Sequence, residues 1–392
     1  MLDKAIKGDG RYWGWIFFLL AVIGVGFVAY LYQYFTGLGA TGMSRDISWG
    51  IYISQLTYLV GVAASGVMLV LPFYLHKHKV FGQITIFGEF MAVGAVLMCL
   101  LFVMVDLGQP MRLFNVVIHP TPNSVLFWDM VVLNVYMFLN IIIGWMILQS
   151  DKKGDKVAKW VKVLIYISIP WAISIHTVTA FLYSGLPGRH FWLSAIMAPR
   201  FLASAFCAGP AILLLILLVL QRMKVIELAR EAIGSLAKII TYAMIANVFF
   251  LSLELFTAFY SNIPGHEETW VYLFAGLKHH GHYYAQLMPF MVFAGILGIL
   301  SLILLIPPQW RNNPTILPFA LVILVIATWI DKGLGLVIGG FIPNPLMEIT
   351  EYAVTIPEIL ITLGVYGIGA LVVTLLFKIA IEVQREVGHV EH

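Results

Sequence analysis

The chain has 392 residues, of which 61% are hydrophobic and only 11% are charged, and its mean hydropathy is +0.93. A soluble domain is about half apolar and about a quarter charged, so this composition excludes a water-soluble fold and indicates that the bilayer is the solvent. The net charge of +3 is small, and Lys and Arg lie between apolar runs instead of forming a basic stripe with aromatic residues. Nucleic acid is therefore not expected as a partner.

Ten predominantly apolar runs are each long enough to cross the hydrocarbon core, which requires about 20 residues. Pro, Gly, Asn and charged residues separate the runs. We therefore predict an all-α integral membrane protein that forms a single polytopic domain over residues 1–392. The first run is longer than the hydrophobic region of a cleavable signal peptide, so we interpret it as a retained transmembrane helix. The predicted spans are 13–35, 51–75, 84–105, 125–148, 161–183, 201–220, 236–260, 284–306, 316–338 and 357–380.

Positive charge is distributed unequally between the two sets of loops. Most of the 23 Lys and Arg residues lie in the two termini and in the loops at 76–83, 149–160, 221–235 and 307–315. Because cytoplasmic loops retain positive charge, we predict a multi-pass protein of the cytoplasmic (inner) membrane with both termini in the cytoplasm. Lys332 lies inside a predicted span, and the opposite loops hold Arg45, Arg112, Arg189, Arg200 and Lys278.

The predicted outer loops are long and rich in Pro, Gly, His and aromatic residues, as in DLGQPMRLFNVVIHPTPNS and SNIPGHEETWVYLFAGLKHHGHYY. A long ordered loop usually has a binding or capping role. Two interpretations remain open, namely a self-packed cap over the helix ends and a docking surface for an external subunit.

A faint internal repeat relates SWGIYISQLTYLVGVAASG in the second span to APRFLASAFCAGPAILLL in the sixth. It predicts a pseudo-repeat over 45–183 and 198–340, arranged as two parallel four-helix bundles of spans 2–5 and 6–9 with spans 1 and 10 at the periphery. Small residues within these segments allow close contact between helices in lipid. They include Gly61, Ser65, Ala205 and Gly209.

Ionisable side chains inside a span are costly, so each one is a candidate functional residue. The predicted orientation places most of them in the outer half of the membrane, which suggests a polar pocket near the outer face built from both bundles. Asp106 and Asp129 lie at span ends, where solvation or helix capping is an alternative, and Asp331 with Lys332 can form an internal ion pair. The set comprises Glu89, Asp106, Asp129, His176, Glu254, Asp331 and Lys332.

Haem groups, iron–sulfur clusters and metal ions each require particular ligand residues, which can be sought in the sequence. A transmembrane b-type haem requires two axial ligands, most often histidines, and His176 is the one histidine well inside a predicted span. Cys99 and Cys207 are too few for a four-cysteine iron–sulfur cluster, so we predict neither haem nor cluster in this chain. The histidines of the loop KHHGHYY can bind metal in principle, but we interpret them as solvated and predict no metal site. These are His279, His280 and His282.

One segment carries a resemblance to a known family. DLGQPMRLFNVVIHPTPNSVLFW, from Asp106 to Trp128, resembles the Asp-x-Gly-Arg-Pro, Arg and Pro-x-Ser pattern of the NrfD, or polysulfide reductase membrane-subunit, family. Trp49 with Gly50 and the segment SIHTVTAFLYSGLPGRHFWLSAIMAPRFLASAFCAG extend the resemblance over roughly 45–340. The ten-span branch is most similar, especially the DsrP-type subunit of the DsrMKJOP complex of sulfate reducers. Gln109 stands where the family often has Arg.

The resemblance implies a quinone-interacting subunit of a respiratory redox complex. Such subunits bind menaquinone or another quinone near the outer face, below a ferredoxin-like iron–sulfur subunit, in complexes that also contain cytochrome subunits. Electron exchange between quinol and the iron–sulfur subunit, coupled to proton transfer, is then the expected function. We predict His176, Asp106 and Glu254 as headgroup or proton-transfer residues. Trp49, Gln55, Tyr58, Arg112 and Asp129 are predicted to contact the quinone.

Two other functions remain open. A secondary transporter also combines internal repeats with intramembrane acids and interrupted helices, and GLGLVIGGFIPNP at 333–345 is compatible with such a broken helix. The third interpretation is a structural anchor without a site.

Overall fold

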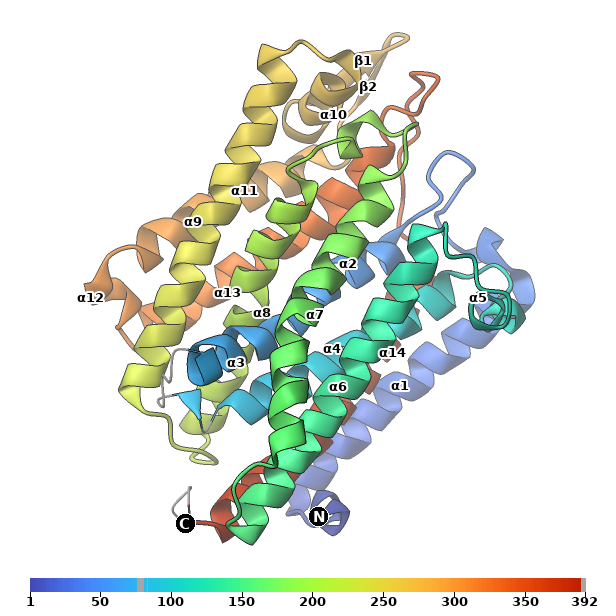
Figure 1. Ribbon diagram of the computed structural model, residues 1–392. Coiled ribbons are helices and arrows are strands. Elements are labelled where there is room, and N and C mark those ends of the chain that lie inside the picture. Colours follow the sequence, from blue (N-terminus) through green and yellow to red (C-terminus); the bar gives the residue numbers. More distant parts are fainter. Residues whose placement is uncertain (76–80, 83, 389–392) are drawn as a thin grey trace.

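The structure is a computed structural model that describes residues 1–75, 81–82 and 84–388. Within these residues, ten helices are long and apolar enough to cross a membrane, which confirms the all-α membrane fold. Both chain ends lie at one end of the molecule, and α10 and the β-hairpin lie at the other (Figure 1). Residues 76–80, 83 and 389–392, which belong to the basic loop and tail used to predict the orientation, lie outside the described residues.

The spanning helices begin and end close to the predicted boundaries because a backbone in hydrocarbon must satisfy its own hydrogen bonds. Two spans are composite, and the sixth begins before the predicted residue 201. The spans are α1 (Gly10–Thr36), α2 (Ile51–Ala63) with α3 (Ser65–Leu75), α4 (Thr85–Asp106), α6 (Val125–Lys153), α7 (Lys159–Ser184), α8 (Met197–Arg222), α9 (Arg230–Tyr260), α11 (Met288–Leu305), α13 (Ile316–Trp329) with the π-helix Ile330–Ile338, and α14 (Ile356–Glu386).

Shorter elements lie between the spans. Two of them, α10 (Pro264–Phe274) and the hairpin of β1 (Leu277–His279) and β2 (His282–Tyr284), stand together before α11. The eighth span accordingly begins at Met288 and not at the predicted residue 284, which belongs to β2. The others are α5 (Asn115–Ile118), α12 (Pro308–Arg311) and the 3-10 helices Leu2–Ile6, Leu38–Ala40, Pro110–Arg112, His190–Trp192 and Gly339–Phe341.

Helices α2 and α4 form the interior of the fold, and α1 pairs with α14 at the periphery. A Cβ atom added to Gly26 of α1 would lie 2.5 Å from the Gly364 Cα of α14, so these two helices touch backbone to backbone. The outward side chains of α1 are large and apolar, as lipid contact requires. The pseudo-repeat and its two bundles stay predictions.

The small residues predicted to permit close helix contact do meet. Added to Gly209 of α8, a Cβ atom would lie 2.8 Å from the Gly61 oxygen and 3.1 Å from the Ser65 nitrogen. Added to Gly61, it would lie 3.4 Å from the Ala205 Cα. The contact between α2 and α8 therefore joins the two halves of the chain through backbone atoms.

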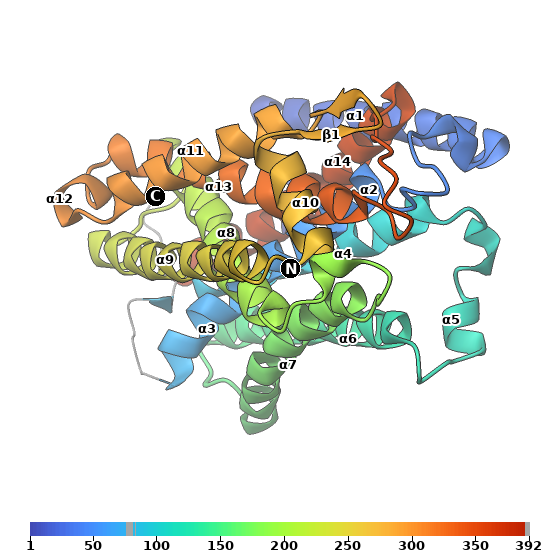
Figure 2. The same ribbon diagram turned by 90° about the horizontal axis from the view of Figure 1, so that it is seen from above.

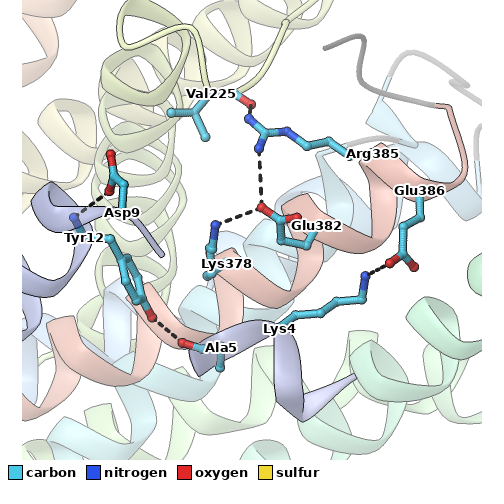
Figure 3. Close-up of polar contacts among 9 residues, drawn as sticks. All are labelled: Lys4, Ala5, Asp9, Tyr12, Val225, Lys378, Glu382, Arg385 and Glu386. Atoms are coloured by element: carbon cyan, nitrogen blue, oxygen red, sulfur yellow. Dashed lines mark hydrogen bonds and ion pairs between the residues drawn. The ribbon is translucent and has the colours of Figure 1, made fainter. Parts of the chain in front are cut away.

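Charged residues tie the two chain ends together (Figure 3). Lys4 forms an ion pair with Glu386 at the end of α14. Tyr12 Oη donates to the Ala5 oxygen at 2.7 Å, and Arg385 Nη2 donates to the Val225 oxygen at 3.0 Å. The first residues are thereby fixed to the last helix at the same membrane face.

The loops at the opposite end pack against one another. Arg189 donates to the Asp46 and Phe341 oxygens, at 3.1 Å in each case, and Thr269 Oγ1 donates to the Ile342 oxygen at 2.7 Å. These contacts form the self-packed cap that was one of the two interpretations. Helix α5 is separate from it and lies at the edge of the molecule (Figure 2), where Met111 and Phe114 are exposed.

Candidate functional site

A cavity of about 320 Å³ opens at the capped end of the helices. Its volume is at the lower end of the range of small-molecule sites. Of the predicted quinone-site residues, Trp49 lines it. The other lining residues are Ser48, Leu186, Pro187, Gly188, Arg189 and Phe341.

Aromatic rings fix the wall of this cavity. Trp49 stacks on Trp192 with ring centroids 5.8 Å apart, and it meets Tyr183 and Phe341 edge to face at 5.5 and 5.9 Å. Trp192 Nε1 donates to the Leu336 oxygen of the π-helix at 2.8 Å. The wall is therefore a rigid apolar surface that suits a flat ring.

Arg189 supplies positive charge at the mouth of the cavity. Its guanidinium lies 4.4 Å from the Phe341 ring centroid. Burial lowers the pKa of Arg189 below its usual value. The Asp46 carboxylate acts in the opposite direction but has the smaller effect. Two of its five N–H groups bond to backbone oxygens, so others can donate to a ligand oxygen.

A column of polar side chains follows one face of α7 from the cavity wall. His176, Thr179 and Tyr183 are spaced three and four residues apart, which places them on the same side of the helix. Tyr183 Oη bonds to Thr57 Oγ1 of α2, and Thr179 Oγ1 donates to Asp129 Oδ1 of α6 at 2.6 Å. Three predicted residues therefore belong to adjoining parts of the structure. Trp49 lies in the aromatic wall, and Asp129 and His176 belong to the polar column.

His176 is fully buried, with an exposed fraction of 0%. Neither ring nitrogen has a hydrogen-bond partner within the described part of the chain, and the ring meets Phe206 edge to face at 6.5 Å. Burying an imidazole without a partner costs free energy. The arrangement suits a group that exchanges a proton, because a neutral imidazole has one nitrogen that can accept a proton and one N–H that can release its proton.

Asp106 lies beside a second polar cluster, at the capped ends of α1, α2 and α14. Tyr52 Oη donates to Gln33 Oε1 at 2.6 Å, and Asp106 lies close enough to interact electrostatically with Tyr52, Tyr183 and Glu358. Its Oδ1 atom is buried without a partner among the residues described. Asp106 therefore interacts electrostatically with residues of both this cluster and the polar column.

Three other predicted residues have different surroundings. Gln55 Oε1 accepts from Trp329 Nε1 at 2.9 Å and from Tyr366 Oη at 2.6 Å, which joins α2 to α13 and α14. Tyr58 Oη donates to the Val325 oxygen of α13 at 3.4 Å. Arg112 is exposed in the 3-10 helix Pro110–Arg112. None of the three lines the Trp49 cavity.

Glu254 belongs to a buried ionic cluster in the second half of the chain. Arg200 pairs with Glu254 and, through Nη2, with Asp331 Oδ1 at 2.8 Å. Lys332 Nζ instead donates to the Phe201 oxygen at 3.2 Å and lies 4.2 Å from the Phe201 ring centroid. The interpretation of Asp331 and Lys332 as an internal pair was therefore wrong, because Arg200 supplies the cation.

Sequence reasoning assigned Arg200 to an outer loop because the apolar run was drawn from Phe201. Helix α8 begins at Met197, so Arg200 lies inside it and is 5% exposed. Pro199, which is favoured in the first turn of a helix, was the available signal for an earlier start.

These features define a class, namely polytopic helical membrane proteins with an aromatic cavity at one end and buried polar groups beneath it. Residues 39–343 match the family described as Polysulphide reductase, NrfD, and the chain belongs to this family. It is 27% identical to a putative dimethyl sulfoxide reductase membrane subunit of Halobacterium salinarum, over 93% of this chain and 89% of that protein.

Two further relatives match shorter parts. The Hdr-like menaquinol oxidoreductase integral membrane subunit of Archaeoglobus fulgidus is 27% identical over 64% of this chain and 62% of its own length. A selenate reductase subunit of Mesobacillus selenatarsenatis is 25% identical over 50% of this chain and 53% of its own length. The finer resemblance to DsrP-type subunits, and with it sulfate reduction, stays a prediction.

Proposed function

We propose that this chain is the quinone-interacting membrane subunit of a respiratory oxidoreductase and that the headgroup of menaquinone, or of another quinone, binds in the Trp49 cavity. The observation that carries the proposal is the position of an aromatic, Arg-bordered cavity next to a buried column that contains His176 and Asp129. A flat ring packs on Trp49, and Arg189 donates to a quinone oxygen. The names of the relatives, which include a menaquinol oxidoreductase subunit, support this assignment.

Quinol oxidation releases two electrons and two protons. His176 accepts one proton in this proposal, and the Asp129 carboxylate, which holds the Thr179 hydroxyl at 2.6 Å, accepts the other. The electrons pass to an iron–sulfur subunit of ferredoxin type above the cap, in a complex that also contains cytochrome subunits. In the opposite direction of electron flow the same groups return the protons.

The transporter alternative loses its main support. Within the segment 333–345, interpreted as a broken helix, residues up to Phe341 continue α13 as a π-helix and then as the 3-10 helix Gly339–Phe341. It reaches the cavity wall through Phe341. The segment is thus a part of the proposed site instead of an interruption in a transport path.

Replacing Trp49 by Leu tests the cavity. We expect kcat/KM for quinol in the intact complex to fall about tenfold, equivalent to about 1.4 kcal/mol, because the stacking surface is lost. Trp160→Leu is the matched control, since Trp160 is 51% exposed and does not line the cavity. Unchanged kinetics in an assembled Trp49→Leu complex, or equal losses in both variants, would contradict the assignment.

We further propose that both termini face the cytoplasm and that the cap faces the cell exterior or periplasm, on the basis of the Lys and Arg distribution. In a variant with Cys99→Ala and Cys207→Ala, a single cysteine at Ser44 should react with an impermeant maleimide added from outside. A single cysteine at Asp155 should react after the membrane is opened. The reverse pattern would overturn the orientation.

A further inference from the structure

The hairpin between α10 and α11 holds two adjacent imidazoles together. Its two-residue turn is formed by His280 and Gly281, with φ of 46° and 81°, which is the left-handed geometry of a tight hairpin. The ring centroids of His279 and His280 are 4.0 Å apart. The turn therefore presents two imidazoles at one point of the cap.

A carboxylate from a distant segment meets this pair. Glu348 Oε2 lies 3.6 Å from His279 Nε2. A direct hydrogen bond would need these atoms roughly half an ångström closer. The Nε2 atom is nevertheless buried and has no hydrogen-bond partner in the described ranges.

These separations suit ligands of one metal ion. One donor atom from each of His279, His280 and Glu348 can be chosen so that all lie within 4.8 Å of one another. Two donors on a tetrahedral Zn²⁺, with bonds of about 2.05 Å, are about 3.3 Å apart. The distance of 3.6 Å from His279 to Glu348 is within a few tenths of an ångström of that value.

The segment that carries Glu348 is held in place independently of any metal. Glu351 Oε1 accepts from Tyr272 Oη of α10 at 3.1 Å and from the Gln286 nitrogen after β2 at 2.8 Å. Glu348 therefore approaches the hairpin from a segment that is already attached to both of its sides. Such preorganisation lowers the entropic cost of bringing the third ligand to the ion.

We propose that His279, His280 and Glu348 form a binding site for a divalent transition metal of the Zn²⁺ class. Two imidazoles and one carboxylate are a ligand set of Zn²⁺, whereas Ca²⁺ and Mg²⁺ prefer oxygen ligands alone. The bound ion joins the hairpin to the segment after the 3-10 helix Gly339–Phe341 and so fixes the cap. This site differs from the sequence expectation of solvated histidines, because Glu348 is adjacent only in the fold.

Metal titration of the purified full-length chain in detergent tests the site. The chain carries no histidine tag, is stripped with EDTA and is titrated with zinc sulfate by calorimetry. We expect one equivalent to bind, and Glu348→Gln and His279→Ala each to raise the Kd at least tenfold. His282→Ala is the matched control, because His282 belongs to the same hairpin but not to the three-ligand group, and its Kd should stay unchanged.

Zinc-edge X-ray absorption of the loaded chain should show two imidazole nitrogens and a carboxylate oxygen. If His282→Ala weakens binding as much as His279→Ala, or if Glu348→Gln leaves the Kd unchanged, the ion binds to surface histidines only and the proposal fails. The Glu348 side chain is 59% exposed, so Glu348→Gln retains the fold and keeps the test decisive if His279→Ala does not fold.

Discussion

Replacing His176 by Phe lowers quinol-linked turnover of the assembled complex at least about tenfold, or about 1.4 kcal/mol in the barrier. Phe fits a site that is fully buried and already in contact with the Phe206 ring, so the fold is retained. The imidazole nitrogens, which have no partner in the residues that the structure covers, are lost as proton acceptors. The measurement is steady-state quinol oxidation by the purified complex, with assembly checked on a native gel.

The control for His176→Phe lies one residue along the same helix. Thr177 is partly exposed and its hydroxyl donates to the Ile173 oxygen at 3.0 Å, so Thr177→Val should leave turnover unchanged. A larger solvent isotope effect in His176→Phe would identify proton transfer as the affected step. Parental turnover with a parental isotope effect would show that His176 is structural. The proton acceptor would then be sought at Asp129 and Asp106, through Asp129→Asn and Asp106→Asn.

Replacing Arg200 by Met lowers the free energy of unfolding by about 3–5 kcal/mol, because it leaves the buried Glu254 carboxylate and the partly buried Asp331 carboxylate without their cation. The measurement is thermal or denaturant unfolding of the full chain in detergent, followed by circular dichroism. Lys378→Met is the control, since it breaks a partly exposed pair with Glu382 at 2.8 Å, seen in Figure 3, and should cost less than about 1 kcal/mol.

A combined variant separates lost charge balance from lost packing. Arg200→Met together with Glu254→Gln and Asp331→Asn removes the whole ionic cluster and should recover most of the loss, because neutral replacement of a buried ion pair is often close to neutral in stability. If Arg200→Met unfolds no earlier than Lys378→Met, the cluster contributes nothing to stability.

Much of the fold was predictable because the bilayer imposes a length and a composition on every span. Close helix approach at Gly61, Ala205 and Gly209 was also predictable, since small residues mark such contacts in lipid, but which helices meet there was not. The rotation of each helix about its axis is set by neighbours and was not predictable. Gln55 accordingly contacts Trp329 and Tyr366 on α13 and α14 instead of the cavity.

The candidate site was predictable only in part. Trp49, Asp129 and His176 came from the family pattern and from the cost of polar groups in hydrocarbon. Arg189 was counted merely as an outer-loop cation, and its place at the cavity mouth depends on contacts with Asp46 and Phe341, far away in the sequence. Residues that meet only through loop packing carry no periodic signal in the chain.

The backbone contact between α2 and α8 has a mechanical consequence. A Cβ atom added to Gly209 would lie 2.8 Å from the Gly61 oxygen, so no layer of side chains separates the two helices at this point. Rotation or sliding of α2 against α8 would have to break this contact. We therefore expect α2 and α8 to move as one rigid body. Displacements during turnover are then expected in the α1–α14 pair, α5 and the cap.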